Sequence, residues 1–229
     1  MKNNIKSYLN NDKFINIFLV LSLFIIYMLF TQFIGGLITK LFNNLNVNVK
    51  LIIVLLSDLL LICLICFIFR KSLKNNLKTL KKDLSDNVVK FFVLYFFGIL
   101  FMILFNMYMI LIFKSTSSNE INVQKLLKIY PLYVAISSCI YAPFMEEMIF
   151  RKGLRKCINN KYLYVILSGL LFGFMHCLGV KEMYQYLFII PYATMGCIFA
   201  HYYYKTNNIL IPILFHVFHN FITLIVSIL

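Results

Sequence analysis

Long apolar runs constrain this chain more than any other feature of its sequence. A helix needs roughly 20 apolar residues to cross a hydrocarbon layer of about 30 Å, and seven runs approach or exceed that length, of which the fifth is the shortest. We therefore expect an all-α, polytopic membrane protein of about seven transmembrane helices. The seven runs cover Phe14–Ile38, Leu51–Phe69, Phe91–Phe113, Pro131–Phe150, Leu163–Leu178, Tyr186–Tyr203 and Ile209–Leu229.

The segments between the runs are too short to form a soluble domain. Of the 229 residues, 62% are hydrophobic and only 13% are charged, whereas a soluble domain carries about a quarter charged residues. The first run is too long for the core of a cleavable signal peptide, and no small-residue cleavage site follows it. We expect one membrane domain over residues 1–229, with accessory helices in 1–130 and the functional core in 131–229.

Basic residues gather in short loops on one side of the predicted spans. The formal net charge is +14, and seven of the 22 lysines and arginines lie in Arg70–Lys90 and five more in Arg151–Lys161. Because basic loops stay on the cytoplasmic side, we expect a multi-pass protein of the plasma membrane whose N-terminus is cytoplasmic. These loops would attract anionic lipid head groups, and their scattering over several loops argues against a nucleic-acid partner.

Ionisable side chains inside the apolar runs are the best candidates for function. Each costs roughly 2.5–3.5 kcal/mol or more at the centre of a membrane helix. All except Asp58 lie in the second half of the chain, and for Asp58 we expect a bracing contact with another helix. The set comprises Asp58, Glu146, Glu147, His176, His216 and His219.

Glu146 and Glu147 form the first polar motif, in the fourth run. Adjacent helical residues point about 100° apart, so the two carboxylates cannot share one task. Glu147 and Arg151 are spaced i, i+4 and can pair along one face, which leaves Glu146 free for acid–base chemistry. Pro143 predicts a kink nearby. The alternative is that both glutamates lie solvated at a helix end.

The fifth run places Phe172 and His176 on one helix face. Gly169 and Gly173 form a GxxxG pattern, which lets a second helix approach closely. A single histidine inside a membrane helix can serve as a structural hydrogen-bonding group, so His176 alone does not identify a reaction.

The seventh run places His216 and Asn220 one turn apart on one face. His219 lies about 60° around the helix from His216. We expect His219 to contact a neighbouring helix, although it is also placed to reach the edge of the same cavity. Three helices thus each bring a carboxylate, an imidazole or an amide into lipid.

At these residues the chain resembles the CPBP family of CAAX proteases and bacteriocin-processing enzymes, also called the Abi family. The family signature is EExxxR, FxxxH and HxxxN on successive helices, and all three motifs are intact and in order. The resemblance covers about residues 131–229, and the first three runs match only as hydrophobic helices. The three motifs are Glu146-Glu147-Met-Ile-Phe-Arg151, Phe172-Gly-Phe-Met-His176 and His216-Val-Phe-His-Asn220.

The resemblance implies an intramembrane endopeptidase related to the type II CAAX prenyl proteases. It implies that Glu146 and His176 activate water. It implies that His216 and Asn220 stabilise the oxyanion or hold the substrate carbonyl. Such groups match what hydrolysis needs, namely a base, a proton shuttle and donors aimed at developing negative charge.

Three further residues of the motifs are expected to support the site. The resemblance implies that Glu147 and Arg151 form an orienting ion pair. Phe172, one turn before the histidine of its motif, belongs to the same supporting set.

The family is described both as metalloproteases and as glutamate-dependent proteases. If zinc is the cofactor, Glu146, His176 and His216 are its expected ligands. The chain lacks an HExxH motif, in which one helix supplies two ligands and the base. We therefore favour a metal-free mechanism with no cofactor and keep Zn²⁺ as the alternative.

The sequence places two of these residues at different depths in the membrane. His176 lies about 20 Å along the fifth run from its cytoplasmic end, whereas Glu146 lies close to the cytoplasmic end of the fourth run. We expect the fifth run to begin as a surface helix near Asn159–Tyr164 and to enter the membrane afterwards.

The substrate is expected to be a hydrophobic or membrane-bound peptide or protein. A composition rich in Asn, Lys, Ile and Phe is typical of a low-GC bacterium, in which a leader peptide, bacteriocin precursor or signalling peptide is more plausible than a prenylated protein. One alternative is a non-catalytic bacteriocin-immunity or peptide-binding membrane protein. Another alternative is a small transporter. The lack of a sequence repeat relating the two halves of the chain argues against it.

Overall fold

The computed structural model describes residues 2–228, without the side chains of residues 2–14 and 16. The last predicted run therefore ends one residue beyond the described part, at Leu229. The side chains of Phe14, at the start of the first run, and of the predicted cytoplasmic residues Lys2, Lys6 and Lys13 also lie outside it. Every regular element described is helical, which confirms the all-α fold class.

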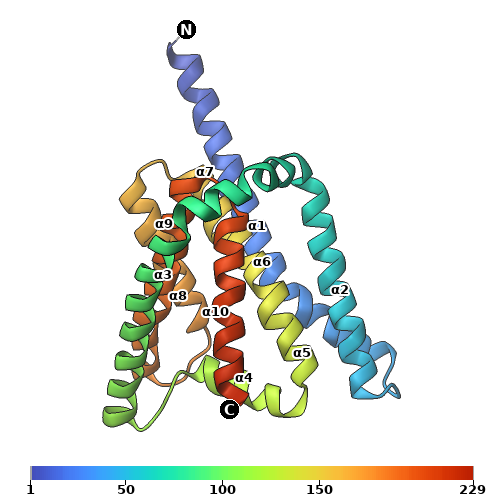
Figure 1. Ribbon diagram of the computed structural model, residues 1–229. Coiled ribbons are helices and arrows are strands. Elements are labelled where there is room, and N and C mark those ends of the chain that lie inside the picture. Colours follow the sequence, from blue (N-terminus) through green and yellow to red (C-terminus); the bar gives the residue numbers. More distant parts are fainter. Residues whose placement is uncertain (1, 229) are drawn as a thin grey trace.

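Three long helices form the N-terminal half. In Figure 1, α1 and α2 lie next to each other in opposite directions, and α3 first crosses the end of the bundle and then turns to run along it. The short helix α4 (Ser118–Ile129) follows at the opposite end. The long helices are α1 (Lys2–Leu41), α2 (Val47–Ile68) and α3 (Arg70–Phe113).

The C-terminal half packs a broken helix against three continuous ones. The broken helix rises from the α4 end to the end crossed by α3, and α8, α9 and α10 then pass alternately between these two ends (Figure 1). The broken helix consists of α5 (Pro131–Ile136), the π-helical η1 (Ser137–Tyr141), α6 (Ala142–Glu147), the π-helical η2 (Met148–Gly153) and α7 (Leu154–Cys157). The rest are α8 (Lys161–His176), the 3₁₀-helical η3 (Met183–Phe188), α9 (Ile189–Thr206) and α10 (Leu210–Ile228).

Within residues 2–228, five helical segments are long and apolar enough to cross a membrane. Helix α8 has 16 residues, which is short of that length, and the broken helix is divided into short elements. The protein is therefore an all-α membrane protein, whereas the number of seven spans stays a prediction. The five segments are Ile17–Leu41, Val47–Ile68, Arg70–Phe113, Met183–Thr206 and Leu210–Ile228.

The predicted surface helix before the fifth run is wrong. Helix α8 runs unbroken from Lys161 to His176, with the Asn160 side chain accepting the backbone N–H of Leu163 at its start. The fourth segment instead continues past Phe150 to Cys157. Because the helix does not end at its first charged residues, Glu146 lies farther from the end of its helical segment than the sequence indicates.

Pro143 changes the helix before it rather than ending it. Proline has no backbone N–H to donate to the preceding turn, and η1 lies directly before α6, in which Pro143 sits. In η1 the N–H of Ala142 bonds to the carbonyl of Ser137, five residues back. The next bond of that pattern would join residue 143 to the carbonyl of Ser138, and Pro143 cannot make it. The expected disturbance at Pro143 thus takes the form of a π-helical stretch.

The predicted close approach at the GxxxG pattern is confirmed. A Cβ atom on Gly169 would lie 2.7 Å from the Ala193 carbonyl oxygen, and one on Gly173 would lie 2.5 Å from the Ile189 carbonyl oxygen. Both contacts are to the backbone of α9. Glycine therefore sets the distance between α8 and α9, which form the most extensive helix pair of the bundle.

Asp58 braces the first two helices, as expected. Its carboxylate accepts a 2.9 Å hydrogen bond from the Thr31 hydroxyl, and Asp58 is buried. By contrast, large apolar side chains on the outer faces of α1, α2 and α3 are exposed, as a lipid-facing surface requires.

Candidate active site

A buried ion pair lies at the centre of the C-terminal bundle. The Nε atom of Arg151 lies 3.0 Å from Oε2 of Glu147, and both side chains have 0% exposure. The Arg151 guanidinium also donates to the Gly196 carbonyl at 3.2 Å and lies 4.6 Å from the centre of the Phe172 ring. The predicted contact between Glu147 and Arg151 is confirmed, and α8 and α9 hold the arginine in place.

Glu147 connects this ion pair to His216 of α10. Its Oε1 atom lies 2.8 Å from Nδ1 of His216, and the histidine is 2% exposed. The His216 ring stacks on Phe199, with ring centres 5.0 Å apart. A carboxylate on one ring nitrogen fixes the orientation of an imidazole and directs its other nitrogen elsewhere. In this protein the other nitrogen is directed toward Glu146.

Glu146 lies between α1 and α10. Its Oε1 atom accepts a 2.6 Å hydrogen bond from the Tyr27 hydroxyl, and its Oε2 atom lies 3.8 Å from Nε2 of His216. Oε2 is buried and has no hydrogen-bond partner among the described residues. Glu147 thus pairs with Arg151 and Glu146 with Tyr27, but both glutamates also contact His216, a shared partner that the sequence did not predict.

His176 lies beside this group rather than within it. Its Nδ1 atom lies 2.9 Å from the Phe172 carbonyl oxygen, and its ring stacks on Tyr192 with centres 4.5 Å apart. The Phe172 ring contacts both histidine rings, at 4.6 Å for His176 and 5.5 Å for His216. The histidine in contact with Glu146 is therefore His216, whereas the sequence paired Glu146 with His176.

Asn220 binds the stretch of backbone that Pro143 disturbs. Its side-chain amide donates a 2.7 Å hydrogen bond to the Ser138 carbonyl, the acceptor that Pro143 leaves without its π-helical donor. His219 points to another helix, where its Nδ1 atom lies 3.2 Å from the Tyr95 hydroxyl of α3, as expected. The oxyanion role that the resemblance implies for Asn220 stays a prediction.

The described residues do not form the zinc site that the sequence left open. No three His, Cys, Asp or Glu side chains in this part of the chain are grouped so that they could hold a metal ion. Glu146 and His216 are neighbours, but the nearest assigned partners of His176 are Phe172 and Tyr192. The site therefore does not fit a zinc ion held by Glu146, His176 and His216.

Tyr27 is the site residue that the sequence did not reveal. It lies in the middle of the first apolar run, which matches no motif. One signal was present, because Tyr27 and Thr31 are spaced i, i+4 and thus place two hydroxyl groups on one face of an apolar helix.

One protein family and two bacterial relatives match part of the chain. The family described as "Type II CAAX prenyl endopeptidase Rce1-like" matches residues 128–222. "UPF0177 protein YvdC" of Lactococcus lactis subsp. lactis (strain IL1403) is 29% identical over 114 residues, which are 49% of this chain and 42% of that protein. "Putative membrane peptidase YdiL" of Bacillus subtilis (strain 168) is 30% identical over 107 residues, which are 45% of this chain and 41% of that protein.

The chain thus spans less than half of the length of these two relatives. No solved structure matches it. The matched region, residues 128–222, contains the broken helix, α8, α9 and most of α10, and hence all the motif residues described above. Over residues 128–222 the chain is thus similar to the type II CAAX prenyl endopeptidases and their Rce1-like relatives.

Proposed function

We propose that this protein is an intramembrane endopeptidase that hydrolyses peptide bonds of a membrane-associated or hydrophobic substrate. The observation that carries the proposal is the pair formed by Glu146 and His216, 3.8 Å apart and both buried. A carboxylate and an imidazole in contact within an apolar bundle supply a base and a proton carrier, the two groups that activation of water requires.

In the proposed reaction, a water molecule binds between Oε2 of Glu146 and Nε2 of His216. Two atoms 3.8 Å apart can both hydrogen-bond to one oxygen atom placed beside the line joining them. Glu146 removes a proton from this water as its oxygen attacks the substrate carbonyl carbon. The proton then passes to the leaving amine, and the second product keeps the new carboxylate.

The neighbouring residues orient this pair. Glu147 holds Nδ1 of His216, and Arg151 holds Glu147, so that Nε2 faces the water. The Tyr27 hydroxyl donates to Oε1 of Glu146 and so orients its carboxyl group. We propose that His176, which faces the same Phe172 ring, contacts the substrate or the developing oxyanion. The steps proposed here use only side chains of the protein, and metal analysis of the purified protein tests this choice.

We further propose that the protein lies in the plasma membrane of a bacterium with its N-terminus in the cytoplasm. The end of the bundle at which α3 begins and α9 ends carries most of the basic residues of the described part, as expected of a cytoplasmic face. The two relatives are both bacterial proteins. A bacterial leader or signalling peptide would supply a substrate of the proposed class.

Cleavage of a hydrophobic peptide library by purified variants tests the proposal. Glu146→Gln keeps the shape of the side chain but removes the base, and we expect cleavage to fall by about 10²–10⁴-fold. Glu182→Gln is the matched control, because Glu182 is exposed in the loop between α8 and η3, outside the three motifs, and it should cleave like the wild type.

Equal cleavage by the Glu146→Gln variant and the wild type would remove Glu146 from the mechanism. Metal content measured on the same samples tests the metal-free form of the proposal. One bound zinc per chain that is lost with His216→Ala would contradict that form. Protection against a bacteriocin that survives Glu146→Gln would instead favour a binding role without catalysis.

A further inference from the structure

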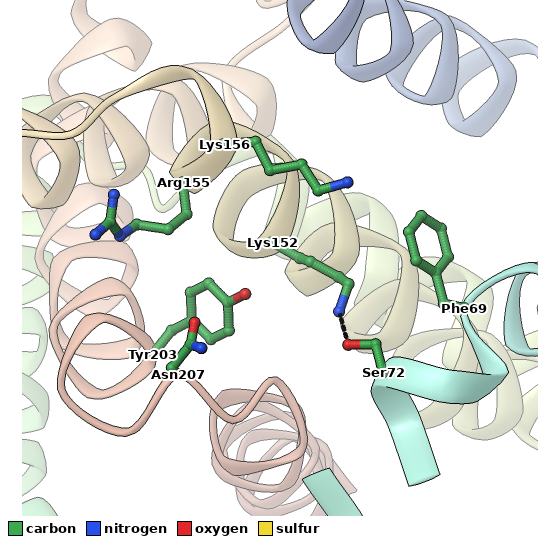
Figure 2. A pocket seen from close by; sticks show the side chains of 7 residues that line it. All are labelled: Phe69, Ser72, Lys152, Arg155, Lys156, Tyr203 and Asn207. Carbon is green, nitrogen blue, oxygen red and sulfur yellow. Dashed lines mark hydrogen bonds between the residues drawn. The ribbon is translucent and has the colours of Figure 1, made fainter. Parts of the chain in front are cut away.

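A basic pocket lies at the end of the bundle crossed by α3, apart from the candidate active site. It has a volume of about 290 Å³ and is lined by residues of the broken helix, of the junction between α2 and α3, and of the end of α9. Figure 2 shows that Lys152 and Lys156 extend toward Ser72 and Phe69, whereas the Arg155 guanidinium points to the other side of the broken helix. The lining contains three basic residues, Lys152, Arg155 and Lys156, and no acidic residue.

Lys152 is the most deeply placed of the three. It is 8% exposed, and its ammonium group donates a 2.6 Å hydrogen bond to the Ser72 hydroxyl (Figure 2). That hydrogen bond uses only one of its three N–H donors. A buried charge is costly unless an opposite charge accompanies it, so Lys152 is placed to bind an anion.

No carboxylate of the described part compensates these charges. Each described ion pair joins Arg151 or His216 to a glutamate of α6. Asp83, a nearby acidic residue on α3, accepts hydrogen bonds from Thr79 and Asn208 instead. Lys152 and Lys156 are also spaced i, i+4 as like charges, an arrangement that destabilises a helix by a few tenths of a kcal/mol without an anion between them.

The pocket is also fixed in shape before any ligand binds. The Arg155 guanidinium lies 4.6 Å from the centre of the Tyr204 ring and donates to the Ile158 carbonyl at 2.9 Å. The Asn208 side chain donates to the Asn76 carbonyl at 2.8 Å, which joins the turn after α9 to the start of α3. A preformed site of this kind loses little conformational freedom on binding.

The position of the pocket indicates the kind of anion. It lies at the ends of helices that cross the membrane, where phospholipid head groups are found. The α2 residues next to Phe69 in the chain, Phe67 and Ile68, are 64% and 62% exposed, so acyl chains have an apolar surface beside the pocket. We propose that this pocket binds the phosphate group of an anionic phospholipid. The proposal does not depend on peptidase activity.

Lipid binding measured by native mass spectrometry in a neutral detergent tests this proposal. The wild type should bind phosphatidylglycerol at least about tenfold more tightly than phosphatidylcholine. Each basic residue near an anionic lipid contributes a factor of about five to binding. Arg155→Gln/Lys156→Gln should therefore weaken phosphatidylglycerol binding by roughly 25-fold. Lys152→Met should weaken it by a similar or larger factor.

The matched control is Lys78→Gln/Lys81→Gln, which removes two exposed charges from the same end of the bundle. It should change phosphatidylglycerol binding by less than about twofold. Circular dichroism checks that each variant is folded, and the double pocket variant keeps the test valid if Lys152→Met does not fold. Competition by inorganic phosphate separates the two sources of the anion, since a lipid site resists it and a site for free phosphate does not.

Two results would overturn the proposal. One is equal binding of phosphatidylglycerol and phosphatidylcholine by the wild type. The other is an equal loss of binding in the pocket and control variants, which would mean that total charge alone attracts the lipid. Unchanged lipid binding together with weaker peptide cleavage in the pocket variants would assign the pocket to an acidic substrate instead.

Discussion

The contact between Asn220 and the Ser138 carbonyl leads to a prediction about stability. The loss of stability caused by replacing Asn220 should depend on whether residue 143 is proline. Pro143 lacks the N–H that would continue the π-helical pattern to Ser138, and the Asn220 amide donates in its place at 2.7 Å. Asn220→Ala leaves this carbonyl without a donor inside the bundle. Hydrogen bonds between membrane helices contribute roughly 0.6–2 kcal/mol, so we expect a loss of that size in the free energy of unfolding.

The same substitution should have little effect once Pro143 is replaced by alanine. An alanine at position 143 restores a backbone N–H, which can donate to Ser138 or to the carbonyl one residue later. In the Pro143→Ala background, Asn220→Ala should lower the free energy of unfolding by less than about 0.5 kcal/mol, because only the contact between the two helices is lost. The interaction energy of this double-mutant cycle should therefore be about 1 kcal/mol.

Unfolding in mixed micelles of increasing dodecyl sulfate content, followed by far-UV circular dichroism, measures these differences. The chain contains no tryptophan, so tryptophan fluorescence is not an option. Asn122→Ala is the control, since Asn122 is exposed on α4, and it should leave stability unchanged in both backgrounds. An equal loss from Asn220→Ala with and without Pro143 would refute the link between the proline and the asparagine.

Three other substitutions test the packing and the site. Gly173→Ala should lower the thermal midpoint in detergent, because its Cβ would lie 2.5 Å from the Ile189 carbonyl oxygen and such overpacking costs about 1–3 kcal/mol. Arg151→Met should cost about 3–5 kcal/mol in unfolding titrations, since it leaves the buried Glu147 without its arginine partner. Tyr27→Phe should slow peptide cleavage by about tenfold, because Glu146 loses a charge-assisted hydrogen bond.

Each of these substitutions has a control within the chain. Gly35→Ala should be neutral, because a Cβ there meets nothing within 4 Å. The double variant Glu147→Gln/Arg151→Met should be more stable than Arg151→Met alone, as no buried charge remains unpaired. Tyr108→Phe removes an exposed hydroxyl from α3 and should cleave normally. A neutral Gly173→Ala, a double variant no more stable than Arg151→Met, or normal cleavage by Tyr27→Phe would contradict the corresponding argument.

The sequence predicts the helical membrane fold and the residues that gather at the site. The length of the apolar runs is enough to predict the fold. The cost of placing a charged group in lipid is enough to identify the residues of the site. The i, i+4 spacing of Glu147 and Arg151 predicts their ion pair, because the contact is local. The two glycines of α8 predict its close packing, although not that α9 is the partner.

Contacts that depend on distant segments are not visible in the sequence. Tyr27 reaches Glu146 across 119 positions, and no spacing rule connects them. The choice between His176 and His216 as the neighbour of Glu146 depends on how the Phe172 ring packs between the two histidines. The charged residues after Phe150 suggest that a helix ends there, yet Arg151 turns inward to Glu147 and the helix continues.

The fate of the proposed water oxygen tests the central claim most directly. Cleavage of a hydrophobic peptide in ¹⁸O-labelled water by the wild-type protein should place one ¹⁸O atom in the new carboxyl terminus of the product, as measured by mass spectrometry. The Glu146→Gln variant, with Glu182→Gln as its control, should form almost none of this labelled product. Labelled product formed at the wild-type rate by Glu146→Gln, or cleavage without ¹⁸O in the product, would contradict hydrolysis at the pair of Glu146 and His216.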